Sequence, residues 1–213
     1  MINKRLLIKN LLSHNDENSF YDKKMKLSLT SKEGKGKFLK HICALSNSNP
    51  TNNSYIIIGI EDEENKIIGV DFFDDSKIQN LVNAYLKNPP KITYENVPFP
   101  SLPRHKVIGL VTIYYNSNIT SLLKNTWKYR KDTIFYRRGS NSMPASKNFE
   151  LRDTNKHTVD AIEKNANNNI ELTLDGVFDF FNNQTNSEAK KLYRAILSAS
   201  LSIVTYLESN VDR

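Results

Sequence analysis

Four acidic residues of this sequence are of the type that suits metal-assisted chemistry on phosphate. Glu17 and Asp22 are five residues apart, and Glu61 and Asp62 follow directly after an apolar run. Carboxylate oxygens are the ligands that Mg²⁺ and Mn²⁺ prefer, and such an ion can activate water and offset charge on a scissile phosphate. Residues 62–65 are also typical of a solvated turn, so a metal site and ordinary surface charge both stand as interpretations.

Two basic segments, residues 23–40 and 124–138, predict contacts with nucleic acid. The second segment interleaves cations with aromatic side chains; basic groups neutralise phosphates and aromatic rings stack on unpaired bases. The residues expected to bind nucleic acid are Lys23, Lys26, Lys128, Arg130, Lys131, Arg137 and Arg138. If the end of the second segment is a strand of period two, Arg137 and Arg138 point to opposite sides, and one of them is expected in the core.

Other residues that could bind an anion or a metal form weaker patterns. Residues 34–37 read Gly-Lys-Gly-Lys before a predicted helix. They lack the spacing and the Lys-Ser/Thr ending of a nucleotide P-loop, so they predict at most anion binding at the helix N-terminus. His41 and Cys43 point to different faces of that helix, which makes them poor joint metal ligands.

The composition indicates a globular protein with a reduced thiol. The chain has 213 residues, of which 38% are hydrophobic and 25% charged, which suits one domain with a helical appendage. Its one cysteine excludes a disulfide framework within the chain and fits a reducing compartment, so we expect a cytoplasmic protein. No run of about 18 apolar residues is present, and we expect no membrane partner.

The positive charge is concentrated in the first part of the chain. The net charge is +7, and residues 151–213 hold more acidic than basic residues, so the excess lies in residues 1–150. A basic body with a mildly acidic tail is typical of a phosphate-binding module whose C-terminal helix packs or forms a homo-oligomer. Compositional bias in a solvated surface is the alternative.

Apolar periodicity predicts an α/β fold in which a mixed sheet is flanked by helices. Strands are expected at 21–29, 55–60, 66–70, 92–97, 107–115 and 133–137, and helices at 37–46, 78–86, 154–164 and 188–207. The run 55–60 is apolar and β-branched, which indicates a buried central strand that forms a hairpin with 66–70. Residues 6–12 suit a helix or a strand.

Three groups of residues occur in an order known from one family. They are Tyr21-Asp22-Lys23-Lys24-Met25-Lys26-Leu27 with a helix ending Ala44-Leu45-Ser46-Asn47-Ser48; Ile56-Ile57-Ile58-Gly59-Ile60-Glu61-Asp62 with Ile67-Ile68-Gly69-Val70; and Thr133-Ile134-Phe135-Tyr136-Arg137-Arg138-Gly139-Ser140 with Pro144-Ala145. This series resembles the Schlafen AlbA-like domain over about residues 15–150. The resemblance implies a domain at 1–150 and a helical C-terminal extension at 151–213.

The resemblance also implies two activities. Nuclease members cut tRNA and rRNA with three carboxylates and a divalent metal, which here would be Glu17, Asp22 and Glu61, with Asp62 as a substitute for Glu61, Lys24 as a phosphate contact and Mg²⁺ or Mn²⁺ as the ion. Other members bind nucleic acid without demonstrated cutting and need no cofactor. The sequence departs from the family at Asn52-Asn53-Ser54, where a glycine pair is usual, and at Glu61, where aspartate is usual.

Three functions follow from these observations. The first is a nucleic-acid-binding protein, for RNA or DNA, that acts as a regulator or a component of an assembly. The second is a metal-dependent endoribonuclease for structured RNA such as tRNA, and the third is an interaction domain. The family's acidic-aromatic-lysine triplet corresponds to Asp22-Lys23-Lys24 here, and a placement at Lys24-Met25-Lys26 would remove its acid. This imperfect match of the acidic residues favours the first function over the second. The charge asymmetry favours either over the third.

Overall fold

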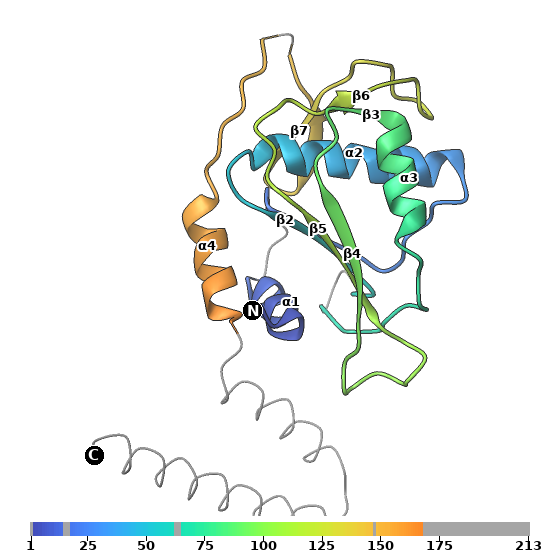
Figure 1. Ribbon diagram of the computed structural model, residues 1–213, viewed down its shortest axis with the longest axis vertical. Helices are drawn as coiled ribbons and strands as arrows, with labels where there is room; N and C mark the ends of the chain where they lie inside the picture. The colour runs from blue at the N-terminus through green and yellow to red at the C-terminus, as the bar shows by residue number, and fades with distance from the viewer. Residues whose placement is uncertain (1, 15–17, 62–64, 147, 168–213) are drawn as a thin grey trace, which may run out of the picture. The chain divides into compact units, whose positions relative to one another are not determined.

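The computed structural model describes residues 2–14, 18–61, 65–146 and 148–167 (Figure 1). The elements in chain order are α1 (Lys4–Ser13), β1 (Tyr21–Lys24), α2 (Lys32–Ser48), β2 (Ser54–Ile58), α3 (Ser76–Tyr85), β3 (Leu86–Lys87), β4 (Ile92–Val97), β5 (Ile108–Ile113), β6 (Ser121–Leu122), β7 (Phe135–Arg138), β8 (Asn141–Pro144) and α4 (Lys156–Asn165). The expected helix at 188–207 lies outside the described residues. Within them, no helix has the length and apolar character needed to cross a membrane.

The main sheet has the strand order β1-β2-β5-β4 and is mixed, because β1 is parallel to β2 while the other neighbours are antiparallel. The predicted α/β fold is therefore confirmed, and so is the inner position of β2, whose residues are all buried. Ile56 and Ile58 pack into one core cluster, and Tyr55 and Ile57 into another. Alternation along the strand thus requires helical cover on both faces of the sheet.

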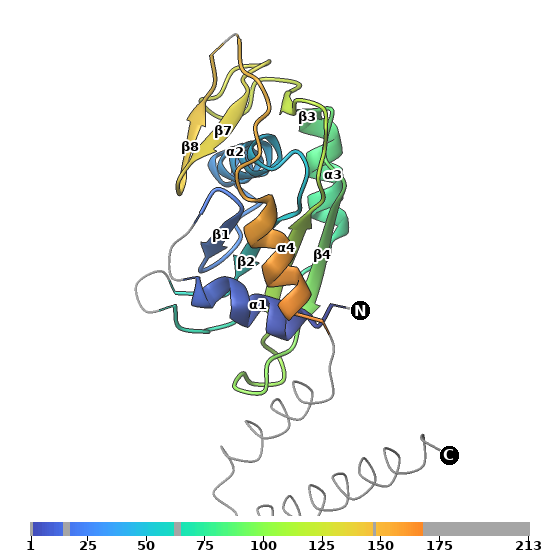
Figure 2. The same ribbon diagram turned by 90° about the vertical axis from the view of Figure 1, so that its left-hand side faces the viewer.

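Helices supply this cover as two outer layers (Figure 2). One layer holds α2 and α3, whose apolar residues join the cluster that contains Ile56. The opposite layer holds α1 and α4, which pack with Tyr55 and Ile57. The backbone N–H of Asn3 donates to the carbonyl of Ala166 at 2.7 Å, so the start of α1 is tied to the end of α4. The compact unit that contains the sheet extends to Asn167.

Two predicted strands differ from the structure near the end of β2. β1 ends at Lys24, so residues 25–29 of the expected strand are not part of the sheet. The Lys24 carbonyl accepts the last hydrogen bonds, from the backbone N–H groups of Gly59 and Ile60. The expected strand 66–70 is wrong: only isolated bridges form there, between Ile60 and Ile67 and between Val70 and Val107. Gly59 has a positive φ of 105°, which breaks the regular pairing. The undecided segment 6–12 is helical.

Helix α2 starts earlier than predicted and contains both glycines of the Gly-Lys-Gly-Lys segment. The Ser31 hydroxyl accepts from the backbone N–H of Gly34 at 2.9 Å and caps the helix. A Cβ at Gly34 would lie 2.0 Å from the Ser28 carbonyl oxygen, and one at Gly36 would lie 3.0 Å from Cβ of Trp127. The segment is therefore a helix interior that allows close packing, and the anion-binding loop considered from the sequence is not formed.

The hairpin of β7 and β8 is attached to the C-terminal half of α2. The side-chain amide of Asn47 donates to the carbonyls of Thr120 and Phe135, at 2.8 Å each, and its oxygen accepts from the backbone N–H of Thr120. The backbone N–H of Arg137 donates to Ser48 Oγ at 2.8 Å. These buried bonds fix β7 beside α2 and so determine which way the Arg137 side chain points.

Candidate nucleic-acid interface

The buried carboxylate of Asp22 is the centre of a charged cluster formed by three elements. Arg137 of β7 places Nη1 3.2 Å from Oδ1, and Lys24 of β1 places Nζ 2.8 Å from Oδ2. His41 of α2 places Nδ1 3.4 Å from the same Oδ2. Period-two alternation on β1 brings Lys24 to the face of Asp22, as the sequence predicts. The single negative charge of Asp22 is thus shared between two permanent cations, Lys24 and Arg137.

Burial and charge determine the protonation states in this cluster. Burial alone would raise the pKa of Asp22, but the facing His41, Lys24 and Arg137 outweigh it and hold that pKa below its ordinary value. Burial lowers the pKa of His41 to about 4; Asp22 opposes this shift, and Lys24 and Lys40 reinforce it. Asp22 is therefore ionised and His41 neutral near pH 7, so the cluster carries excess positive charge.

Lys40 and Lys128 add to this excess, whereas Lys37 pairs its Nζ with Oε1 of Glu33 at 2.7 Å. Lys40 is half-buried, and its side-chain ammonium group forms no hydrogen bond or ion pair in the described part of the chain. Its pKa is lowered, first by desolvation and then by repulsion from Lys24, with Lys128 and Arg137 contributing. Lys37 and Lys128 both lie over the ring of Trp127, at 5.7 Å and 4.4 Å from its centroid. We call Lys24, Lys37, Lys40 and Lys128 the lysine face.

The residues predicted to bind nucleic acid divide into exposed and buried ones. Lys26, Lys128, Arg130, Lys131 and Arg138 are exposed. Lys23 is buried, and its Nζ donates to Oδ1 of Asn65 at 2.5 Å. Arg137 is buried against Asp22. Alternation on β1 and β7 turns the side chains of Lys23 and Arg137 inward, and their contact with nucleic acid stays a prediction.

The predicted metal ligands are only partly described. Glu17 and Asp62 lie outside the described residues. Asp22 is opposite Ile56 in the β1–β2 register, whereas Glu61 follows Ile56 by five residues, beyond the end of β2. The described ranges contain no group of three His, Cys, Asp or Glu residues able to hold a metal. An ion on Asp22 would have to displace Lys24 from Oδ2, so the metal site with Mg²⁺ or Mn²⁺ stays a prediction.

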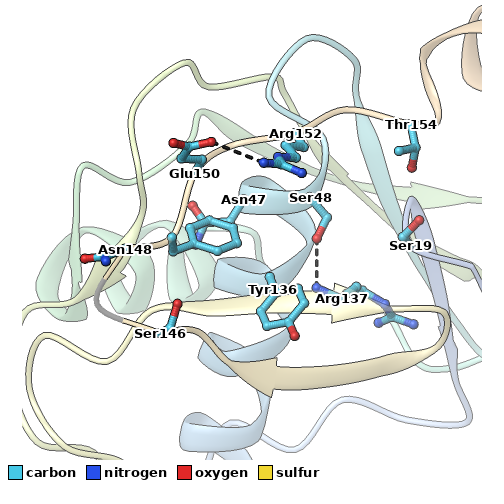
Figure 3. A pocket seen from close by; sticks show the side chains of 11 residues that line it. Ser19, Asn47, Ser48, Tyr136, Arg137, Ser146, Asn148, Glu150, Arg152 and Thr154 are labelled. Carbon is cyan, nitrogen blue, oxygen red and sulfur yellow. Dashed lines mark hydrogen bonds and ion pairs between the residues drawn. The ribbon is translucent and has the colours of Figure 1, made fainter.

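A hollow of about 510 Å³, lined mostly by polar residues, shares Arg137 with the cluster (Figure 3). Its wall includes Tyr136 and Phe149, whose ring centroids are 5.5 Å apart, and Arg137. Asn47 and Ser48 also line it, but both are engaged in the bonds that hold β7 to α2. The hollow therefore borders the structural junction of these elements and adds hydrogen-bonding groups next to the charged cluster.

The sequence pattern did not predict Lys40 and His41 as members of the site. Their helical segment shows only an apolar stripe, and the polar residues between its apolar positions are equally compatible with solvent. The one available signal was the excess of lysine in residues 23–40. For Arg137, period-two alternation did indicate that one of the two neighbouring arginines is in the core, and the structure places Arg137 there.

Comparison with known proteins gives the family of this chain. No curated protein matches it. A crystal structure of the DIP2311 protein from Corynebacterium diphtheriae is similar with 14% identity and a TM-score of 0.42, over 67% of this chain and 27% of that one, so this chain spans about a quarter of that protein. A domain of unknown function, DUF5929, matches residues 157–197. The profile described as "Schlafen, AlbA_2" matches residues 17–146, which is more than half of the sequence, and the chain therefore belongs to the Schlafen AlbA_2 family.

Proposed function

We propose that this protein binds nucleic acid, RNA or DNA, through the lysine face. The observation that carries the proposal is the crowding of cations around a single carboxylate. Lys24, Lys128 and Arg137 each repel the ammonium group of Lys40, and Asp22 is the acidic group that attracts it. A phosphate anion placed against Lys40 relieves this repulsion, and phosphate contacts supply most of the non-specific affinity for nucleic acid.

Family membership supports the same ligand class, because the Schlafen AlbA_2 domain fits a role in nucleic-acid binding. The exposed cations Arg130 and Lys131 extend the positive surface along the chain from Lys128. A polyanion that repeats its charge along a backbone uses several such cations at once, whereas a single small anion uses one or two. The arrangement therefore favours a nucleic-acid strand over an isolated phosphate.

The experiment measures binding of fluorescently labelled single-stranded and duplex oligonucleotides by anisotropy at several salt concentrations. Lys40→Gln and Lys128→Gln should each weaken binding. Each should also reduce the slope of log K against log salt by about 0.7 for a single strand or about 0.9 for a duplex. Lys164→Gln is the matched control, because Lys164 is exposed on α4 in the layer across the sheet. Binding by the wild type that is absent at low salt, or independent of salt, would contradict the proposal.

A further inference from the structure

Trp127 occupies a backbone position that favours glycine. Thr126 and Tyr129 exchange backbone hydrogen bonds of 3.0 and 2.9 Å, so Trp127 and Lys128 are the two central residues of a tight hairpin turn. Trp127 has a positive φ of 52° at the first central position, where type II′ turns prefer glycine. A bulky side chain in this region is unusual, and such outliers occur at functional sites more often than elsewhere.

The turn presents the indole ring at the edge of the lysine face. Trp127 remains 38% exposed, which leaves ring surface open to a ligand. The Cβ of Trp127 sits close against α2, where Gly36 provides the necessary space. The ring of Tyr129 meets it edge-on at 5.4 Å between centroids, and Tyr129 in turn contacts the buried Phe135 at 5.1 Å. One end of this row of rings is anchored in the core, and the other end is Trp127.

Two cations lie over the exposed ring, and one of them, Lys37, is also paired with Glu33. Lys37 and Lys128 approach it from different elements, α2 and the turn. Lysines next to an aromatic face match the repeating unit of a nucleic-acid strand. Each nucleotide offers a phosphate to a cation and a base to a ring. Base stacking on an aromatic side chain needs a free base face, and in a duplex both faces of an internal base are covered by its neighbours.

We propose that Trp127 stacks on an unpaired base and makes the lysine face selective for single-stranded segments of RNA or DNA. This inference rests on the proposed function and specifies its substrate class. On binding, the lysine side chains move from the ring to neighbouring phosphates, and the indole stacks on the base. Selectivity then comes from ring stacking, because the lysines attract single strands and duplexes alike.

Intrinsic fluorescence gives a direct test, since Trp127 is the only tryptophan of the sequence. The wild type is titrated with oligo(U), oligo(dT) and a duplex of equal length. Stacking should quench the indole emission with either single strand, and the duplex should quench it much less. In anisotropy measurements with labelled oligo(dT) and oligo(U), Trp127→Gly should bind roughly 5- to 150-fold more weakly, in line with the loss of one stacked base.

Trp127→Gly is suited to this test because glycine accepts the positive φ and preserves the turn. Trp127→Tyr should restore most of the single-strand affinity by keeping a ring. Tyr115→Ala, which removes a 65% exposed ring from the loop after β5, is the control and should bind like the wild type. If Trp127→Gly melts at a lower temperature, the affinity of Trp127→Tyr and the quenching of the wild type show whether residue 127 stacks on a base.

Different results would contradict base stacking by Trp127 and nucleic-acid binding by the lysine face. Salt-dependent binding of the wild type to single strands and duplexes with equal affinity, and with unchanged indole emission, would overturn stacking and leave the lysine face in place. Absence of binding to all three oligonucleotides would overturn the proposed function itself.

Discussion

Asp22 and Arg137 form an ion pair in the interior of the protein although 115 residues separate them in the sequence. Both side chains are almost fully buried, and the Oδ1–Nη1 distance is 3.2 Å. The pair links the edge strand β1 directly to β7 of the β7–β8 hairpin. A buried charge that loses its partner costs far more than an exposed one, so this pair makes the cluster sensitive to substitution.

Arg137→Met should destabilise the protein by about 3–5 kcal/mol, because it leaves the Asp22 carboxylate buried with only Lys24 as a permanent cation beside it. Urea unfolding followed by circular dichroism measures this change. Arg138→Ala, which changes the exposed neighbour on the same strand, should stay within about 0.5 kcal/mol of the wild type. Similar losses in the two variants would show that Arg137 is not the partner of Asp22.

The double variant Asp22→Asn, Arg137→Met should lose less stability than the two single changes added together. Each single change leaves one buried charge without its partner, and the double change removes both charges. Measured as a double-mutant cycle, the coupling should be about 1–3 kcal/mol for residues in direct contact. Additive losses would argue against the pair.

The free energy of unfolding should fall as the pH decreases from 6.5 towards 4. Burial lowers the pKa of His41 to about 4, so in this window the unfolded chain binds a proton that the folded protein does not. Stability therefore rises with pH there, by up to about 3 kcal/mol in total. The lowered pKa of Asp22 adds a loss of stability mainly below 3.8, the ordinary pKa of an aspartate, outside this window.

His41→Gln should flatten this pH dependence, because glutamine keeps a polar side chain without the titration. Thermal melting at pH 7 and at pH 4.5 gives the comparison, and His157→Gln, an exposed histidine on α4, is the control. Equal decreases in melting temperature for the wild type and His41→Gln would refute the assignment.

Gly34→Ala should destabilise the protein more than Gly36→Ala. A Cβ at residue 34 meets a backbone carbonyl oxygen at 2.0 Å, whereas at residue 36 it meets the Trp127 side chain at 3.0 Å, where the turn can move. Overpacking of this kind costs about 1–3 kcal/mol, and alanine regains up to about 1 kcal/mol in helix propensity. We expect a clear loss for Gly34→Ala and a change near zero for Gly36→Ala in urea unfolding.

Asp22→Asn distinguishes the two roles considered for this carboxylate. As a counter-ion to the cluster, its neutralisation should leave nucleic-acid binding intact or strengthen it a few-fold, since one negative charge is removed beside the lysine face. As a metal ligand, its neutralisation should abolish any cleavage of labelled tRNA or single-stranded DNA that requires Mn²⁺ and stops with EDTA. A gel that records both shift and cleavage for the wild type and Asp22→Asn separates these outcomes.

The sequence alone was sufficient for the elements whose periodicity is strong. The β-branched run at β2, the alternating strand β4 and the apolar stripes of α3 and α4 are local patterns, and burial on one or two faces follows from them directly. The family could also be inferred, because its motifs are short segments in a fixed order. Local patterns failed at 66–70, where the positive φ of Gly59 and Gly69 interrupts strand pairing.

Only the tertiary structure decided which charged residues meet. Alternation on β7 allowed either arginine to be buried, and the bonds from Asn47 and Ser48 of α2 to β7 determined that Arg137 faces Asp22. In the same way, the close approach of a turn to Gly36 placed Trp127 beside Lys37, some 90 residues earlier in the chain. Contacts of this kind depend on how distant elements pack, and a sequence pattern carries no information on that packing because it reports only the apolar face of each element.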